Sequence, residues 1–280
     1  MRVADNKELK GLDLFNHLRE NKDEIVKAKK SMPISSDSFT VDTSKEYIKD
    51  STVIKTKSLE AKGEDESDEL DSLNVKVVAN MSMVCDSHQD VLAPDCWKKT
   101  IKERQNVIPH LHDHKHTIEA KVGIVKRIFS EMIDLKKIGV KSSVKEAQAL
   151  VFETEIKKDF NKKIFELYKS GEVNQHSIGL QYIKIDLAVN SEDSDFKQEF
   201  KLWNKHINDI VNPDSATERG YFWYVSEIKL FENSAVLFGS NEITPTLEVE
   251  KIQPISVTEQ KEPLKDTQEE NKSLTIYDLI

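Results

Sequence analysis

The chain has 280 residues, of which 38% are hydrophobic and 32% are charged, and its formal net charge is −9. This acidic balance argues against nucleic-acid binding as the main activity, because that activity needs a basic surface that displaces counterions from phosphates. No stretch approaches the ~20 apolar residues that span a bilayer, and the polar start at Met1–Asn6 does not resemble a signal peptide. We therefore expect a soluble protein inside a cell that contacts other proteins, and neither membrane nor nucleic acid.

The first quarter of the chain divides into a helical segment and a charged linker. Apolar residues recur at helical spacing over residues 7–31, and Pro33 ends this pattern. Residues 34–73 are rich in Ser, Thr, Lys, Asp and Glu. Their acidic run Glu64–Glu69 repels itself and buries little surface, which is typical of a linker. The sequence thus predicts an N-terminal helical extension and acidic linker over residues 1–73.

From residue 74 onward the pattern changes to short strands with a few helices between them. Strands are predicted at residues 75–79, 150–156, 176–187 and 221–231, and a pair of strands at 107–111 and 120–129. Helices are predicted from residue 94, at 159–170 and at 192–210. Residues 246–280 are polar again and are predicted to form a C-terminal tail. This mixture indicates either an α+β fold or a β-barrel with helices packed around it.

Three short segments of the middle region contain the residue types that activate a serine hydroxyl. Ile108–His114, Gln175–Leu180 and Val225–Ile228 supply, in this order, a base, a nucleophile and an acid. A serine hydroxyl is a poor nucleophile unless an imidazole takes its proton, and that imidazole needs a partner that fixes its tautomer. The chain order His, Ser, acid differs from the orders in chymotrypsin, subtilisin and the α/β-hydrolases, which indicates a different scaffold.

These segments resemble the tailed-phage prohead (capsid maturation) serine proteases, which are related in fold to the herpesvirus assemblins. The resemblance covers roughly residues 74–245, and its motifs are Leu111–His114, Ser177–Leu180 and Glu227–Leu230, with Asn80–Pro94 as the opening strand and turn. It implies an α+β fold in which a strand-dominated barrel, formed by a serine protease domain over residues 74–245, is flanked by helices.

The resemblance also implies a function. The chain would be a serine endopeptidase that cleaves phage scaffold and major capsid protein, and itself, during prohead maturation. Ser177 would attack the peptide carbonyl, His114 would carry the proton, and Glu227 would orient His114. His176 and Asp113 remain alternatives for the third residue, and His112 for the base. No cofactor is implied. The protein is expected to form a homo-oligomer in the host cytoplasm, inside the assembling prohead.

Two other functions are compatible with the sequence. His110, His112, His114 and His116 alternate, so on a strand they would share one face and suit a metal-dependent hydrolase. However, same-face neighbours on a strand lie ~7 Å apart, and a tetrahedral site usually draws its ligands from more than one element. The second alternative is a non-enzymatic capsid assembly or scaffold protein that retains a protease-like domain.

Overall fold

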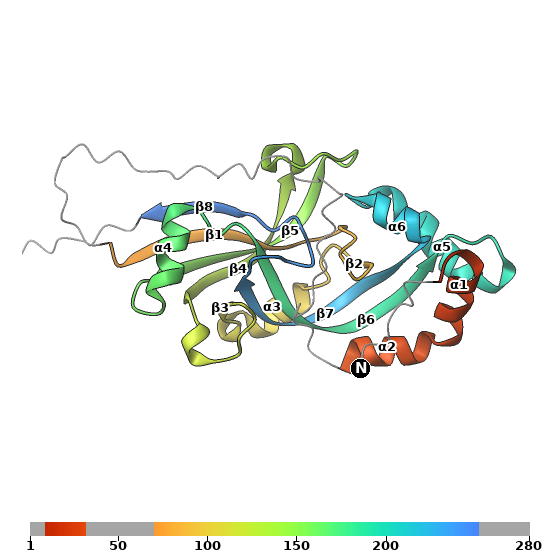
Figure 1. Ribbon diagram of the computed structural model, residues 1–280, viewed down its shortest axis with the longest axis horizontal. Helices are drawn as coiled ribbons and strands as arrows, with labels where there is room; N and C mark the ends of the chain where they lie inside the picture. Colours follow the sequence, from red (N-terminus) through yellow and green to blue (C-terminus); the bar gives the residue numbers. More distant parts are fainter. Residues whose placement is uncertain (1–8, 32–69, 252–280) are drawn as a thin grey trace, which may run out of the picture.

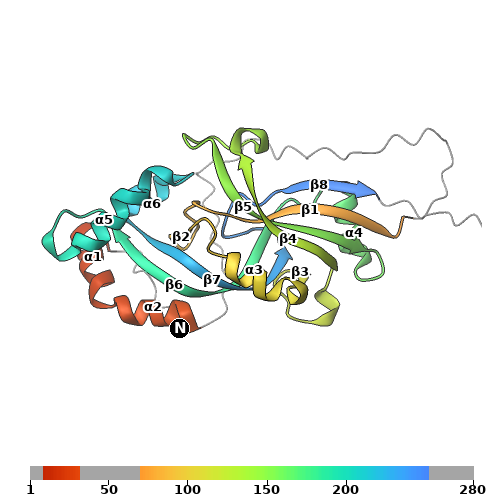
Figure 2. The same ribbon diagram turned by 180° about the vertical axis from the view of Figure 1, so that it is seen from behind.

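The computed structural model describes residues 9–31 and 70–251. Within these residues it is a mixed α+β fold with two sheets and six α-helices, drawn out along one axis (Figure 1). Seen from behind, one sheet and α4 lie at one end, and most of the other helices gather at the opposite end (Figure 2). No helix in the two described ranges is long and apolar enough to cross a membrane.

The first sheet is antiparallel and has the strand order β4-β5-β1-β8. Its strands are β1 (Ser72–Met81), β4 (Gly123–Asp134), β5 (Glu146–Lys157) and β8 (Thr246–Lys251). Helix α4 (Lys162–Ser170) packs against β1 and β5. The Asn161 side chain accepts a hydrogen bond from the Ile164 N–H, and Gly171 ends the helix at φ 79°, which is the conformation for which glycine is favoured.

The second sheet is built around the long strand β7 (Tyr221–Ala235). The strand β6 (His176–Val189) runs antiparallel along one edge of β7. On the other edge, two short strands pair with β7 in parallel: β2 (Asp90–Leu92) near its start and β3 (His110–His112) near its end. The end of β7 therefore lies between the segment that holds Ser177 and the segment that leads to His114.

Helices cover the other end of the β6–β7 pair. They are α1 (Gly11–Glu20), α2 (Lys22–Ser31), α5 (Lys197–His206) and α6 (Pro213–Arg219), whereas α3 (Lys98–Arg104) lies against β7 and β4 (Figure 1). Single 3-10 turns occur at Gln105–Val107, Ile118–Ala120, Leu135–Ile138, Ser194–Phe196 and Ile207–Asp209.

The N-terminal helices belong to the hydrophobic core. Leu14, Leu18 and Ile25 are at most 1% exposed and pack in the same cluster as the β6–β7 sheet. The Lys29 Nζ lies 2.6 Å from an Asp90 carboxylate oxygen, and Asp90 is fully buried. A buried carboxylate is costly to leave without its partner, so this ion pair fixes α2 on the sheet.

The structure confirms the α+β class and corrects the finer expectations. The sheets do not close into a barrel. The strands expected at 107–111 and 120–129 form as β3 and β4, but they pair with β7 and β5, and only an isolated bridge joins Leu111 to Lys121. The described part of the predicted helical segment, residues 9–31, contains the two helices α1 and α2, and β8 lies within the predicted tail of 246–280. Residues 34–69 of the predicted linker and residues 252–280 of that tail lie outside the described residues, and β1 already begins at Ser72.

Candidate active site

The strand β6 presents Ser177 on the face opposite the core. Ser177 is paired with Ser234 of β7, and Gly179 with Glu232. Directly paired residues of antiparallel strands point to the same face, so these four residues share one face. His176 and Ile178 point the other way, into the core. The alternation of β6 thus separates Ser177 from its neighbour His176.

The base candidate His114 lies in a turn and not on a strand. The strand β3 ends at His112, and Asp113 and His114 both have φ 53°. The backbone N–H of Asp113 donates to the Ala235 carbonyl at 2.9 Å. This turn brings the His114 side chain, which is only 4% exposed, over the end of β7.

The His114 ring is bound to Glu232. The Nδ1 lies 2.6 Å from Oε1 of Glu232, whose side chain is 1% exposed. A carboxylate accepts only, so Nδ1 carries the proton and Nε2 is the basic nitrogen of the neutral ring. This is the tautomer that a general base needs in order to take a serine proton.

The Glu232 carboxylate lies directly on the backbone of β6. A Cβ placed on Gly179 would come within 2.4 Å of Oε1 of Glu232, so this approach requires glycine. Ser177 is two residues away on the same face, about 7 Å along the strand. The fold therefore brings Ser177, His114 and Glu232 together on one face of the β6–β7 pair.

Glu227, the acid expected from the sequence, lies elsewhere. It is paired with Lys184 in the β6–β7 register and accepts salt bridges from Lys184 Nζ at 2.6 Å and Lys99 Nζ at 3.1 Å. Hydrogen bonds from these two ammonium groups lower the pKa of the Glu227 carboxyl. Glu227 precedes Ser234 by seven residues, which places it roughly 20 Å from Ser177 along the strands. The expected contact between Glu227 and His114 is therefore corrected: Glu232 makes it.

The alternative residues also have other partners. The Asp113 carboxylate lies 3.0 Å from His112 Nδ1 and 3.2 Å from Lys115 Nζ, and these two contacts help to lower its pKa, against the opposing effect of partial burial. His176 is buried among core side chains. Neither residue occupies the position next to the His114 ring that Glu232 holds.

The four alternating histidines do not share a face. His110 is fully buried, the turn at residues 113–114 ends the strand pattern, and His116 is exposed. In the part of the chain that the structure describes, no group of three or more His, Cys, Asp or Glu residues is arranged to hold a metal ion. The geometry on which the metal-dependent alternative relied is therefore absent there.

Comparisons with protein-family models, with curated proteins and with solved structures find no match for this chain. Function must therefore be argued from the site itself and from the sequence motifs.

A chain of buried hydrogen bonds lies beneath the site, on the core side of the sheet. His176 Nδ1 is 2.9 Å from the Thr244 carbonyl, so it donates, and His176 Nε2 accepts from the Tyr168 hydroxyl at 3.0 Å. His110 Nε2 then donates to the Tyr168 oxygen at 3.1 Å, and His110 Nδ1 accepts from Thr154 at 3.0 Å. Every ring nitrogen is satisfied with both imidazoles neutral.

This buried pair makes the stability of the fold sensitive to acid. Burial lowers the pKa of His176 from 6.5 to about 4, and burial together with the nearby His176 lowers that of His110 well below its usual value. Between pH 6.5 and 4 the unfolded chain binds more protons than the folded one. The two neutral histidines therefore make their full contribution to the free energy of unfolding above about pH 6.5. This contribution is lost as the pH falls, and the loss for His176 amounts to about 3 kcal/mol at pH 4.

The wild type should lose more unfolding free energy than His176→Gln when the pH is lowered from 7.5 to 4. We expect the difference between the two losses to be about 2–3 kcal/mol. Urea unfolding at both pH values measures this change, and His116→Gln at an exposed position is the matched control. An equal pH dependence in the wild type and both variants would show that the buried histidine does not titrate as stated.

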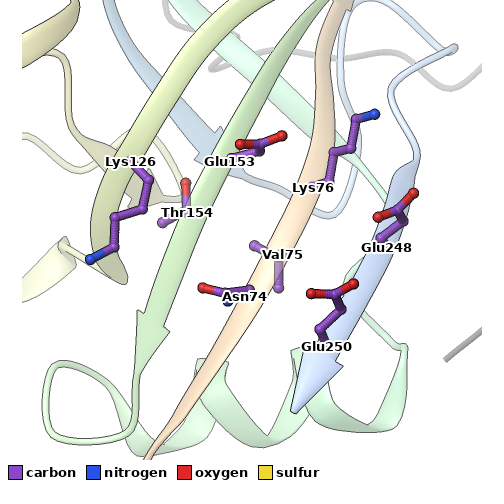
Figure 3. A pocket seen from close by; sticks show the side chains of 8 residues that line it. All are labelled: Asn74, Val75, Lys76, Lys126, Glu153, Thr154, Glu248 and Glu250. Atoms are coloured by element: carbon purple, nitrogen blue, oxygen red, sulfur yellow. The ribbon is translucent and has the colours of Figure 1, made fainter. Parts of the chain in front are cut away.

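A pocket of about 370 Å³ lies on the first sheet, and its lining does not combine a serine, a histidine and an acid as the candidate active site does (Figure 3). The side chains that line it come from β1, β4, β5 and β8 and are mostly ionic. Lys76 and Lys126 are paired with Glu131 and Glu155, and Glu153 with Arg127. These are strand-surface ion pairs, and the pocket contains no serine or cysteine beside a histidine.

The sequence contained one usable signal for the acid that was missed. A glycine inside a strand often marks a close approach of another group to the backbone. In the sequence Gly179 belongs to the serine motif, and in the structure it makes room for Glu232. Ser234 carried no comparable signal, because an isolated serine on a strand is common.

Proposed function

We propose that this chain is a serine endopeptidase in which Ser177 is the nucleophile, His114 the base and Glu232 the acid that orients the base. The observation that carries this proposal is the 2.6 Å contact of His114 Nδ1 with a buried Glu232, on the sheet face that presents Ser177. Nothing in this mechanism requires a cofactor.

The chemistry follows from this arrangement. Ser177 Oγ attacks the peptide carbonyl carbon while its proton passes to His114 Nε2, and Glu232 stabilises the imidazolium that forms. The tetrahedral intermediate then expels the amine, which takes the proton from His114 and leaves an acyl group on Ser177. A water molecule loses a proton to His114 and attacks the acyl carbon. The bond from that carbon to Ser177 Oγ then breaks, His114 returns the proton to Oγ, and the second product leaves as a carboxylic acid.

We further propose that the substrates are the scaffold and major capsid proteins of a tailed phage, cleaved inside the assembling prohead in the host cytoplasm by a homo-oligomeric enzyme. The support for this step is the resemblance of the motifs around His114 and Ser177 to the prohead proteases. The arrangement of Ser177, His114 and Glu232 supports acyl transfer, and the resemblance of the motifs supports the choice of capsid and scaffold proteins as substrates.

The packing of the N-terminal helices restricts how self-cleavage can proceed. Loss of residues 1–73 would remove Leu14, Leu18 and Ile25 and would expose the apolar side chains of the sheet on which they pack. It would also leave the buried Asp90 without Lys29. A cut within residues 32–69 would instead leave α1 and α2 bound to the sheet. We therefore propose that self-cleavage separates the helices from the chain without removing them from the fold.

The proposed function is tested by mass spectrometry of the wild type and Ser177→Ala after co-expression with the capsid protein encoded by the same genome. We expect truncated capsid protein with the wild type and with Ser226→Ala, an exposed serine on β7, and intact capsid protein with Ser177→Ala. Identical cutting by all three proteins would overturn the mechanism. Intact capsid protein in assembled proheads that contain the wild type would favour a non-enzymatic scaffold protein.

A further inference from the structure

The turn that presents His114 is strained and is held by the end of β7. Left-handed backbone costs about 1–2 kcal/mol for a residue other than glycine, and Asp113 and His114 both adopt it in succession. The Lys115 N–H closes this turn on the His112 carbonyl, and two further hydrogen bonds tie the turn to β7: the Asp113 N–H donates to the Ala235 carbonyl, and the His114 N–H donates to Ser234 Oγ at 3.2 Å. A strained conformation persists only where its surroundings fix it.

Ser234 also binds the acid. Its hydroxyl donates to Oε2 of Glu232 at 2.7 Å, while Oε1 of the same carboxylate accepts from the His114 ring. Ser234 is fully buried and is the β7 partner of Ser177. One hydroxyl group therefore contacts the backbone of the base and the carboxylate that orients the ring of the base.

We propose that Ser234 is a positioning residue that holds His114 and Glu232 as one unit opposite Ser177. Without its hydroxyl, the carboxylate can rotate about its terminal bond, and the turn loses one of its two backbone hydrogen bonds to β7. Both changes move Nε2 relative to the nucleophile, and a displacement of about 1 Å can reduce a rate by about 100-fold. This inference rests on the proposed serine mechanism.

Ser234 itself is not in a position to be the nucleophile. Its oxygen accepts from the His114 backbone and its proton is donated to Glu232, so the hydroxyl is not directed at a base. Ser177 is 6% exposed, whereas Ser234 is completely buried. A covalent probe should therefore modify Ser177 and not Ser234.

The test uses the full-length protein and diisopropyl fluorophosphate. In this reaction Ser177 Oγ forms a bond to phosphorus, fluoride leaves, and the hydroxyl proton passes to His114 Nε2. The rate of labelling reports activation of the nucleophile without any knowledge of the natural substrate. Peptide mapping identifies the labelled residue, and thermal unfolding shows that each variant is folded.

We expect Ser234→Ala to lower the labelling rate by about 10–100-fold, Ser234→Thr to recover most of it, and Ser226→Ala to match the wild type. A double-mutant cycle separates positioning from a general structural effect. If Ser234 acts through Glu232, adding Ser234→Ala to Glu232→Gln should reduce the rate by less than about 3-fold further.

The outcomes distinguish the two proposals. A wild-type rate in Ser234→Ala would overturn the positioning role while the serine mechanism stands. Effects of Ser234→Ala and Glu232→Gln that multiply in the double variant would overturn the action of Ser234 through Glu232 and leave only its hydrogen bond to the His114 backbone. A wild type that takes no label, or takes it at a residue other than Ser177, would overturn the proposed function, and the positioning role would fall with it.

Discussion

Replacement of Glu232 by glutamine should lower the rate at which Ser177 is labelled or acylated by roughly 10⁴-fold. The carboxylate oxygen 2.6 Å from His114 Nδ1 compels that nitrogen to carry the proton. A glutamine can turn its amide N–H₂ toward the ring instead, which favours the tautomer with the proton on Nε2. That tautomer has no lone pair available for the proton of Ser177.

The matched control is the same substitution at Glu227, the acid first expected from the sequence. Because Glu227 is bound to Lys99 and Lys184 and lies far along β7, we expect Glu227→Gln to keep the rate within about 2-fold of the wild type. The measurement is the diisopropyl fluorophosphate labelling rate, with capsid cleavage as a second readout. A larger loss in Glu227→Gln than in Glu232→Gln would reverse the assignment of the acid.

Much of the secondary structure could be read from the sequence because it depends on local signals. The strands predicted at 176–187 and 221–231 and the helix predicted at 159–170 are examples, and they occur in the structure as β6, β7 and α4. The strand β8 was missed since it has only six residues among polar ones. Its place in the sheet depends on pairing with β1, which lies far away in sequence.

The identity of the acid depends on register, and register is not a local property. Several shifts interrupt the pairing of β6 with β7 between Gly179 and Ile185. Each shift moves the pairing by one residue, so it decides which β7 side chains share the face of Ser177 and Gly179, and one sequence does not reveal where the shifts occur.

The turn at residues 113–114 could not be predicted from the sequence either. Left-handed backbone is usually signalled by glycine or asparagine, whereas here it is adopted by an aspartate and a histidine. The strand predicted at 107–111 is close to β3, which ends at His112, but the sequence did not show that a turn at residues 113–114 takes His114 and His116 off the strand.

Gly179→Ala should abolish most of the activity while leaving the protein folded. The added methyl group would lie 2.4 Å from Oε1 of Glu232 and 3.0 Å from its Cδ and Cγ, so the side chain has to move. The clash is with the end of a flexible side chain and not with backbone. Overpacking of this kind costs about 1–3 kcal/mol of stability. The displaced carboxylate can no longer accept from both His114 and Ser234 in their present positions.

We expect the labelling rate of Ser177 in Gly179→Ala to fall by about 100-fold or more, with urea unfolding still cooperative. Ile183→Ala, a partly exposed position on the same strand, should change neither quantity appreciably. A wild-type rate in Gly179→Ala would mean that the carboxylate does not need its place on the β6 backbone. Loss of rate in a folded Gly179→Ala would show that the glycine of the serine motif makes room for the acid that orients His114.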